Sequence, residues 1–125
     1  MRVLKFGGTS VADAEAIERL VAIVRRERAS AARPGMLVVV SALSGVTDRL
    51  LALAELARRG KSALALESLE TLRARHREVT RAVVDGVRVE PVLAGLDEHL
   101  DYLGAALKAL SVLRELPPRG GACTW

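Results

Sequence analysis

The sequence predicts an incomplete α/β fold, in which parallel β-strands and helices alternate at the N-terminal side and a long helical hairpin follows. Half of the 125 residues are hydrophobic, which allows a single globular domain to bury a core. Leucine and alanine number 20 each, so strong helix formers dominate. Within the first 40 residues, two short apolar runs flank one amphipathic helix pattern, an arrangement that is typical of a βαβ unit.

The first expected element is a strand from Arg2 to Phe6. Its apolar residues run directly into the pair Gly7-Gly8, which indicates a tight loop immediately after the strand. Lys5 would then lie at the carboxyl end of this strand.

A helix and a second strand are expected next. Asp13 can cap the helix, because apolar residues follow it at spacings of three and four, at Ile17, Leu20, Val21 and Val24. Pro34-Gly35 breaks the chain after the helix. Residues 36–40 form a continuous apolar, largely β-branched run, which predicts a strand buried on both faces and therefore parallel to the first.

Three further helices are expected after the second strand. The first carries leucine and alanine between positions 50 and 57, with Gly60 as a candidate C-cap. The other two cover residues 62–84 and the segment from Pro91 to residue 110, and their leucines repeat at helical spacing, so they predict a helical hairpin. Two strands are too few for a complete doubly wound sheet. We therefore expect residues 1–118 to be the front portion of a larger domain and residues 119–125 to be an atypical, mobile tail.

Composition and charge exclude several classes of function. The net charge is +4, but the arginines lie beside acidic residues and three aromatic side chains give no stacking platform, so we expect no nucleic-acid partner. The longest apolar run has five residues and no apolar segment follows the first basic ones, so we expect neither a membrane span nor an export signal, and a cytoplasmic location. The single cysteine, Cys123, excludes an internal disulfide.

The first loop, from Lys5 to Ser10, has the chemistry of an anion site. Two glycines let backbone N–H groups approach an anion closely, Thr9 and Ser10 offer hydroxyl donors, and the following helix directs its positive end the same way. Lys5 adds a point charge suited to phosphoryl oxygens. The loop matches neither the P-loop nor the dinucleotide fingerprint, so an ordinary turn remains the alternative on spacing alone.

The second loop, residues 41–48, supports the same interpretation. It clusters the hydroxyls of Ser41, Ser44 and Thr47 after a predicted strand and before a helix. In an open α/β sheet the carboxyl ends of parallel strands share one edge, so both loops should meet there. The alternative is ordinary helix capping by Ser44 or Thr47.

Both loops resemble those of a known family. The run Lys5-Phe6-Gly7-Gly8-Thr9-Ser10 after an N-terminal strand is similar to the opening of the aspartate kinases, and residues 39–47, Val-Val-Ser-Ala-Leu-Ser-Gly-Val-Thr, resemble that family's second motif. The resemblance covers residues 1–118, including the hairpin. It implies an amino-acid kinase, or carbamate kinase-like, fold. It also implies transfer of the ATP γ-phosphoryl group to the side-chain carboxylate of L-aspartate, the first step towards lysine, threonine and methionine.

The resemblance also implies roles for individual residues. Lys5 would act catalytically by contacting the transferring phosphoryl group, and the ATP phosphates would be bound by Lys5 together with Gly7, Gly8, Ser10 and Ser41. Thr47 would contact aspartate. Mg²⁺ would arrive with ATP, and no metal ligand is assigned to the chain. His76 and His99 lie among charged residues on predicted helices without a second ligand at a spacing of four, so neither is assigned a role.

One departure from the family concerns the last ten residues. The aspartate kinases continue into a strand and a Ser-x-Gly-Glu-like motif, which this sequence does not contain. We therefore expect a truncated chain that is inactive alone and that self-associates through exposed apolar surface. Two alternatives stay open: a noncatalytic helical interaction fragment, and another amino-acid kinase such as an N-acetylglutamate kinase.

Overall fold

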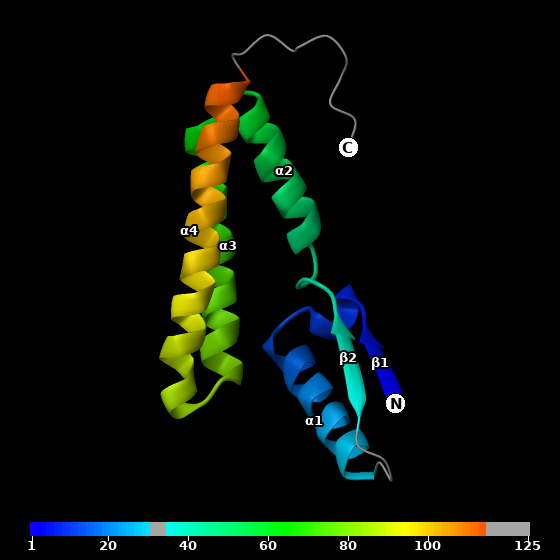
Figure 1. The fold of residues 1–125 in the computed structure, drawn as a ribbon. Coiled ribbons are helices and arrows are strands. Elements are labelled where there is room, and N and C mark those ends of the chain that lie inside the picture. The colour runs from blue at the N-terminus through cyan, green and yellow to red at the C-terminus, as the bar shows by residue number, and fades with distance from the viewer. Residues whose placement is uncertain (31–34, 115–125) are drawn as a thin grey trace.

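The structure is a computed structural model that describes residues 1–30 and 35–114. The tail expected over residues 119–125 lies outside these ranges. A two-stranded parallel sheet with one covering helix forms one end of the molecule, and the three helices that follow in the chain form the other (Figure 1). Within the described part of the chain, no helix combines the length and apolarity needed to cross a membrane.

The βαβ unit predicted from the sequence is confirmed. Strand β1 (Arg2–Phe6) pairs in parallel with strand β2 (Met36–Val40), and Lys5 lies opposite Val39 in the register. Between the strands come the short 3₁₀ helix η1 (Gly8–Val11) and helix α1 (Ala14–Ser30). Asp13 caps α1 as expected, because its Oδ1 accepts a hydrogen bond from the Ala16 N–H at 2.8 Å.

The expectation that β2 is buried on both faces is wrong. Leu37 is 47% exposed and Val40 is 55% exposed, and the two valines between them are exposed as well. The physical reason is that only one helix, α1, lies against the sheet (Figure 1). Leu37 and Val39 share the face of Val3 and Lys5, away from α1, whereas Val38 and Val40 share the face of Phe6 and are covered by α1 only in part. The continuous apolar run therefore predicted the parallel pairing of β2 correctly. Among the described residues, however, there are too few packing elements to bury both faces of this strand.

The core lies among the three helices that follow β2. Helix α2 (Val46–Arg58) is followed closely by Gly60, whose positive φ of 76° allows the turn into α3 (Ser62–Val83). After the 3₁₀ turn η2 (Gly86–Arg88), helix α4 (Val89–Leu113) returns along α3 and completes the predicted hairpin (Figure 1). The buried side chains of these helices form one cluster: Val46, Leu53, Ala57, Ala65, Leu69, Leu72, Leu100 and Leu107.

A glycine sets the spacing within this hairpin. Gly104 of α4 is buried, and a Cβ built on it would lie 3.3 Å from Leu69 Cδ2 and 3.6 Å from Leu66 Cδ2. The missing side chain thus makes room for two leucines of α3. Because of this space, α3 and α4 pack close together, and Leu69 is almost completely buried between them.

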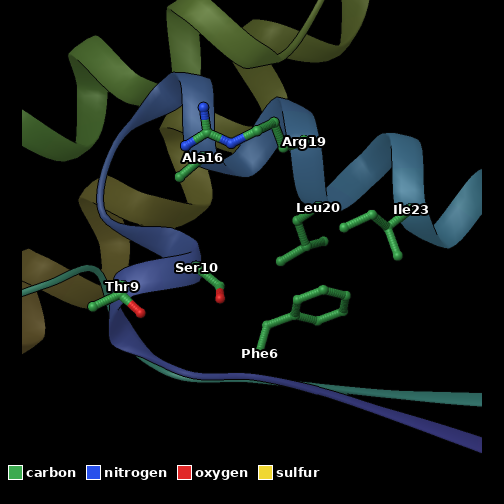
Figure 2. A pocket seen from close by; sticks show the side chains of 7 residues that line it. All are labelled: Phe6, Thr9, Ser10, Ala16, Arg19, Leu20 and Ile23. Carbon is green, nitrogen blue, oxygen red and sulfur yellow. The ribbon is translucent and has the colours of Figure 1, made fainter.

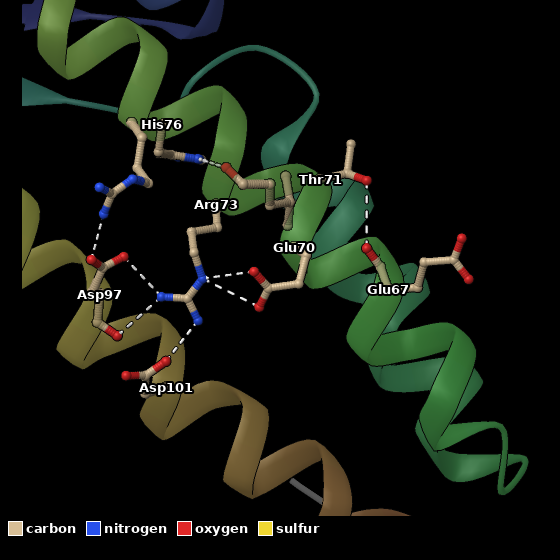
Figure 3. Close-up of polar contacts among 9 residues, drawn as sticks. Glu67, Glu70, Thr71, Arg73, His76, Asp97 and Asp101 are labelled. Carbon is tan, nitrogen blue, oxygen red and sulfur yellow. Dashed lines mark hydrogen bonds and ion pairs between the residues drawn. The ribbon is translucent and has the colours of Figure 1, made fainter.

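An ion-pair network joins the outer faces of α3 and α4 (Figure 3). Arg73 donates to Asp97 at 2.8 Å and to Asp101 at 2.7 Å on α4, and to Glu70 at 3.0 Å on its own helix. Arg77 pairs with Asp97 as well. The hydrogen bond from Arg73, with further help from Arg77, holds the pKa of Asp97 below its ordinary value.

This network should make the hairpin acid-sensitive. A carboxylate whose folded pKa is depressed stabilises the fold fully above its unfolded pKa, and the effect is lost as the pH falls through the folded value. We expect Asp97→Asn to lower the free energy of unfolding above about pH 5, and the difference from the parent to shrink below about pH 4. Urea unfolding measured across this pH range checks the prediction. A difference that stays constant down to about pH 2 would contradict it.

Candidate functional site

The loops that follow β1 and β2 lie side by side, as their predicted place at one sheet edge required. The Ser41 N–H donates to the Phe6 carbonyl at 3.2 Å, which ties the start of the second loop to the end of β1. A Cβ built on Gly8 would lie 3.9 Å from Ser41 Oγ, so these two residues are immediate neighbours across the loops. Parallel pairing of the strands is what brings residues 33 positions apart together.

Both loops line one open cavity of about 420 Å³. The lining residues come from η1, from the loop after β2 and from the start of α2: Gly8, Thr9, Ser41, Ala42, Leu43, Ser44, Gly45, Thr47 and Asp48. The cavity therefore contains three residues that the sequence singled out, namely Gly8, Ser41 and Thr47. It also presents further hydroxyl groups and the N-terminal end of α2, a set of donors that suits phosphate or carboxylate oxygens.

Capping of α2 by Ser44 or Thr47, the alternative left open by the sequence, is wrong. The N-cap residue is Gly45, at a positive φ of 79°, and no side chain caps the helix. The Val46 N–H instead donates to the Leu43 carbonyl at 3.0 Å. Ser44 and Thr47 are both exposed at the cavity, so their hydroxyl groups are not used to hold the helix end.

Lys5 lies close in sequence to the cavity but does not line it. Successive residues of a strand point to opposite faces, and Phe6 faces α1, as Figure 2 shows. Lys5 therefore projects from the sheet face away from α1, where it is exposed and shares that face with Val39. The structure places its backbone at the carboxyl end of β1, which agrees with its predicted position.

Ser10 is directed to a different place. It lines a second cavity of about 240 Å³ between the sheet and α1, together with Phe6, Thr9, Ala16, Arg19, Leu20 and Ile23 (Figure 2). Its backbone N–H donates to the Gly7 carbonyl at 3.0 Å and so closes η1. Thr9 lines both cavities and is the residue between them. The structure thus separates Ser10 from Ser41, which the sequence had grouped together.

The glycines of the first loop are not required by the backbone of this chain. Neither Gly7 nor Gly8 has a positive φ, and a Cβ at Gly7 would meet nothing within 4 Å. The described fold would therefore accept small side chains at both positions, and the loop backbone at these glycines is not covered by a side chain of its own.

The described residues offer no preformed metal site, since residues 1–30 and 35–114 contain no group of three or more histidine, cysteine, aspartate or glutamate side chains that could hold an ion. The one carboxylate at the cavity is Asp48, in the first turn of α2, where it complements the helix dipole. His76 Nδ1 lies 2.7 Å from the Leu72 carbonyl within α3, and His99 is exposed on α4.

Sequence reasoning noted Thr9 and Ser44 as donors but did not assign them to the site, and Asp48 was not assigned to it either. All three line the cavity. Their position in the sequence could have identified them. Each is adjacent to an assigned residue or lies in the same short loop, and residues of a short turn line the same side of a cavity.

Comparison with known proteins gives a consistent group. The model of the amino acid kinase family matches residues 1–113. The bifunctional aspartokinase/homoserine dehydrogenase 1 of Arabidopsis thaliana is 33% identical over 110 residues, which are 88% of this chain and 12% of that protein. The aspartokinase of Chlamydia trachomatis is 40% identical over 79 residues, which are 63% of this chain and 16% of that one.

A third relative is an aspartokinase from Rickettsia prowazekii, 49% identical over 51 residues, which are 41% of this chain and 11% of the relative. The chain therefore spans 11 to 16% of the length of these three proteins.

Proposed function

Because the chain belongs to the amino acid kinase family, we propose that it carries the phosphate-binding and aspartate-binding loops of an aspartate kinase. The reaction joins a side-chain carboxylate oxygen of L-aspartate to the γ-phosphorus of ATP, while the bond to the bridging oxygen breaks and ADP leaves. The observation that carries this proposal is the single open cavity shared by the loops after β1 and β2. Relatives named as aspartokinases support the choice of substrate.

The proposed roles follow from the positions of the residues. Gly8 and Ser41 are neighbours at the cavity and would bind ATP phosphates, with Gly7 and Ser10 supporting the same loop. Thr47, in the first turn of α2, would donate a hydrogen bond to aspartate. Two anionic substrates repel each other, so a wall of hydroxyl and N–H donors serves both binding and charge stabilisation.

Lys5 is proposed as the catalytic group of this segment. Phosphoryl transfer needs positioning and charge stabilisation more than a protein nucleophile, and an ammonium group at a strand end can supply both. Lys5 is exposed and its flexible stem can turn over the strand end towards the loops.

Kinases use nucleotide and metal in general, but the residues described here do not form a cage for Mg²⁺. Mg²⁺ prefers near-octahedral oxygen coordination and keeps several waters, so we propose that it arrives bound to the ATP phosphates. No step of the proposal assigns a ligand to it. A cytoplasmic location remains a prediction of the sequence.

The proposal is tested by joining residues 1–113 to the remaining part of the kinase domain of an aspartokinase relative. We expect ADP release that depends on aspartate, since the cavity would receive the substrates in the family's arrangement. N-acetylglutamate in place of aspartate serves as the matched control. Turnover with N-acetylglutamate alone would select the other amino-acid kinase, and no turnover with either substrate, in a folded fusion, would favour the noncatalytic fragment.

We also propose that the 125-residue chain self-associates through the open face of its sheet. Three apolar side chains are exposed there: Val3, Leu37 and Val39. Within the described residues the sheet has only two strands, so the outer edge of each strand can pair with another molecule. Light scattering should give a mass well above the 13.4 kDa of one chain. Leu37→Lys should reduce this mass and Val87→Lys, at an exposed position in η2, should not. A monodisperse parent monomer would refute the proposal.

A further inference from the structure

One side chain of the hairpin reaches across to the first loop. Arg75, on α3, donates from Nη2 to the backbone carbonyl of Ala12 at 3.0 Å, a contact between residues 63 positions apart. The guanidinium is partly buried, so the contact is shielded from competing water. A charged donor on a carbonyl forms a stronger hydrogen bond than a neutral one.

The carbonyl that Arg75 holds stands at a junction. Ala12 directly follows η1, the 3₁₀ turn that carries Gly8 and Thr9 to the cavity, and it precedes the Asp13 cap of α1. The neighbouring Val11 and Ala16 are buried, which anchors the junction from the apolar side. A change at this carbonyl is therefore expected to shift the end of η1, and with it Gly8 and Thr9.

The other wall of the cavity is attached to the same hairpin by different means. Val46 and Leu53 of α2 belong to the buried cluster with the leucines of α3 and α4, so the Ser41–Thr47 side of the cavity is fixed by apolar packing. The hairpin thus contacts both walls. Its link to the first wall, however, includes a single long polar side chain.

The neighbouring arginines of α3 are used differently. Arg73 and Arg77 pair with carboxylates of α4, whereas Arg75 contacts the loop backbone. We propose that Arg75 is a positioning residue. It holds the first wall of the cavity, formed by Gly8 and Thr9, in place relative to the second wall, formed by the loop after β2 and the start of α2. Its effect on kinetics rests on the proposed function; its effect on the loop does not.

Hydrogen exchange of the 125-residue chain tests the contact itself. In Arg75→Ala we expect the Ser10 amide, which is bonded to the Gly7 carbonyl, to exchange about tenfold faster, while the amide of Leu100 in α4 keeps its rate. Arg75→Lys, which keeps one donor and the charge, should show a smaller increase. Arg81→Ala removes an exposed arginine of the same helix and should change neither amide.

Three outcomes would overturn the assignment: an unchanged Ser10 rate in Arg75→Ala, an equal rise in Arg81→Ala, or an equal rise at Leu100, which would mean general destabilisation. If Arg75→Ala does not fold, Arg75→Lys decides the case by the same comparison of Ser10 with Leu100.

Kinetics of the fused kinase domain give a second readout. Arg75→Ala should raise the KM for ATP about tenfold and leave the KM for aspartate within about twofold, since it releases the first wall and not α2. Parallel increases of both KM values would reject a positioning role at the phosphate loop. A fusion without aspartate-dependent turnover would reject the proposed function alone, because the exchange experiment decides the role of Arg75 without catalysis.

Discussion

Replacing Lys5 by alanine is expected to lower kcat of the fused kinase domain by about 100-fold or more, the scale seen when one preorganised electrostatic donor is removed. The ammonium group would stabilise charge that develops on the transferring phosphoryl group, so its loss acts mainly in the transition state. The KM for aspartate should change much less. Steady-state ADP release at varied aspartate and ATP measures both quantities.

Thr47→Ala provides the contrast. A hydroxyl that contacts aspartate in the ground state contributes uniform binding, so its removal should raise the KM for aspartate about tenfold and spare kcat. The control for Lys5→Ala is Lys61→Ala, which removes an exposed lysine just before α3 and should leave kcat unchanged.

The folded fraction of each variant must be determined independently, because activity lost through misfolding leaves the kinetics of each folded molecule normal. A correctly folded Lys5→Ala protein with near-normal kcat would reject the assignment of the phosphate loop.

Replacing Leu69 by alanine should have the largest effect on stability, lowering the free energy of unfolding by about 3 kcal/mol. Leu69 is 1% exposed and packs against the bare backbone of Gly104, so neither helix can close the space that the missing atoms leave. A loss of this size is a large fraction of the roughly 5–15 kcal/mol that stabilises a typical domain. Denaturant unfolding followed by circular dichroism measures it.

Leu64→Ala is the control for this change. Leu64 lies on the same helix but is 51% exposed, so the same substitution should change the free energy of unfolding by no more than about 0.5 kcal/mol. Equal losses for both variants would mean that the hairpin core does not determine the stability of the chain.

Elements with strong local signals were predicted closely. Asp13 marked the start of α1, and Gly60 lies just after the end of α2, as expected, because caps and turns depend on a few adjacent residues. The meeting of the two loops at one sheet edge was predicted as well. Gly8, Ser41 and Thr47 do line one cavity, since parallel strands carry their following loops to the same edge.

The sequence by itself determined the parallel βαβ unit, the hairpin and the polar groups that the two loops present, because these depend on periodicity and on residue types in short segments. The tertiary structure decided what depends on packing between distant segments. It left β2 exposed, directed Ser10 towards α1 instead of Ser41, and brought Arg75 to the carbonyl of Ala12. Burial and long-range contacts depend on which surfaces meet in space, and periodicity within one segment carries no information about its neighbours.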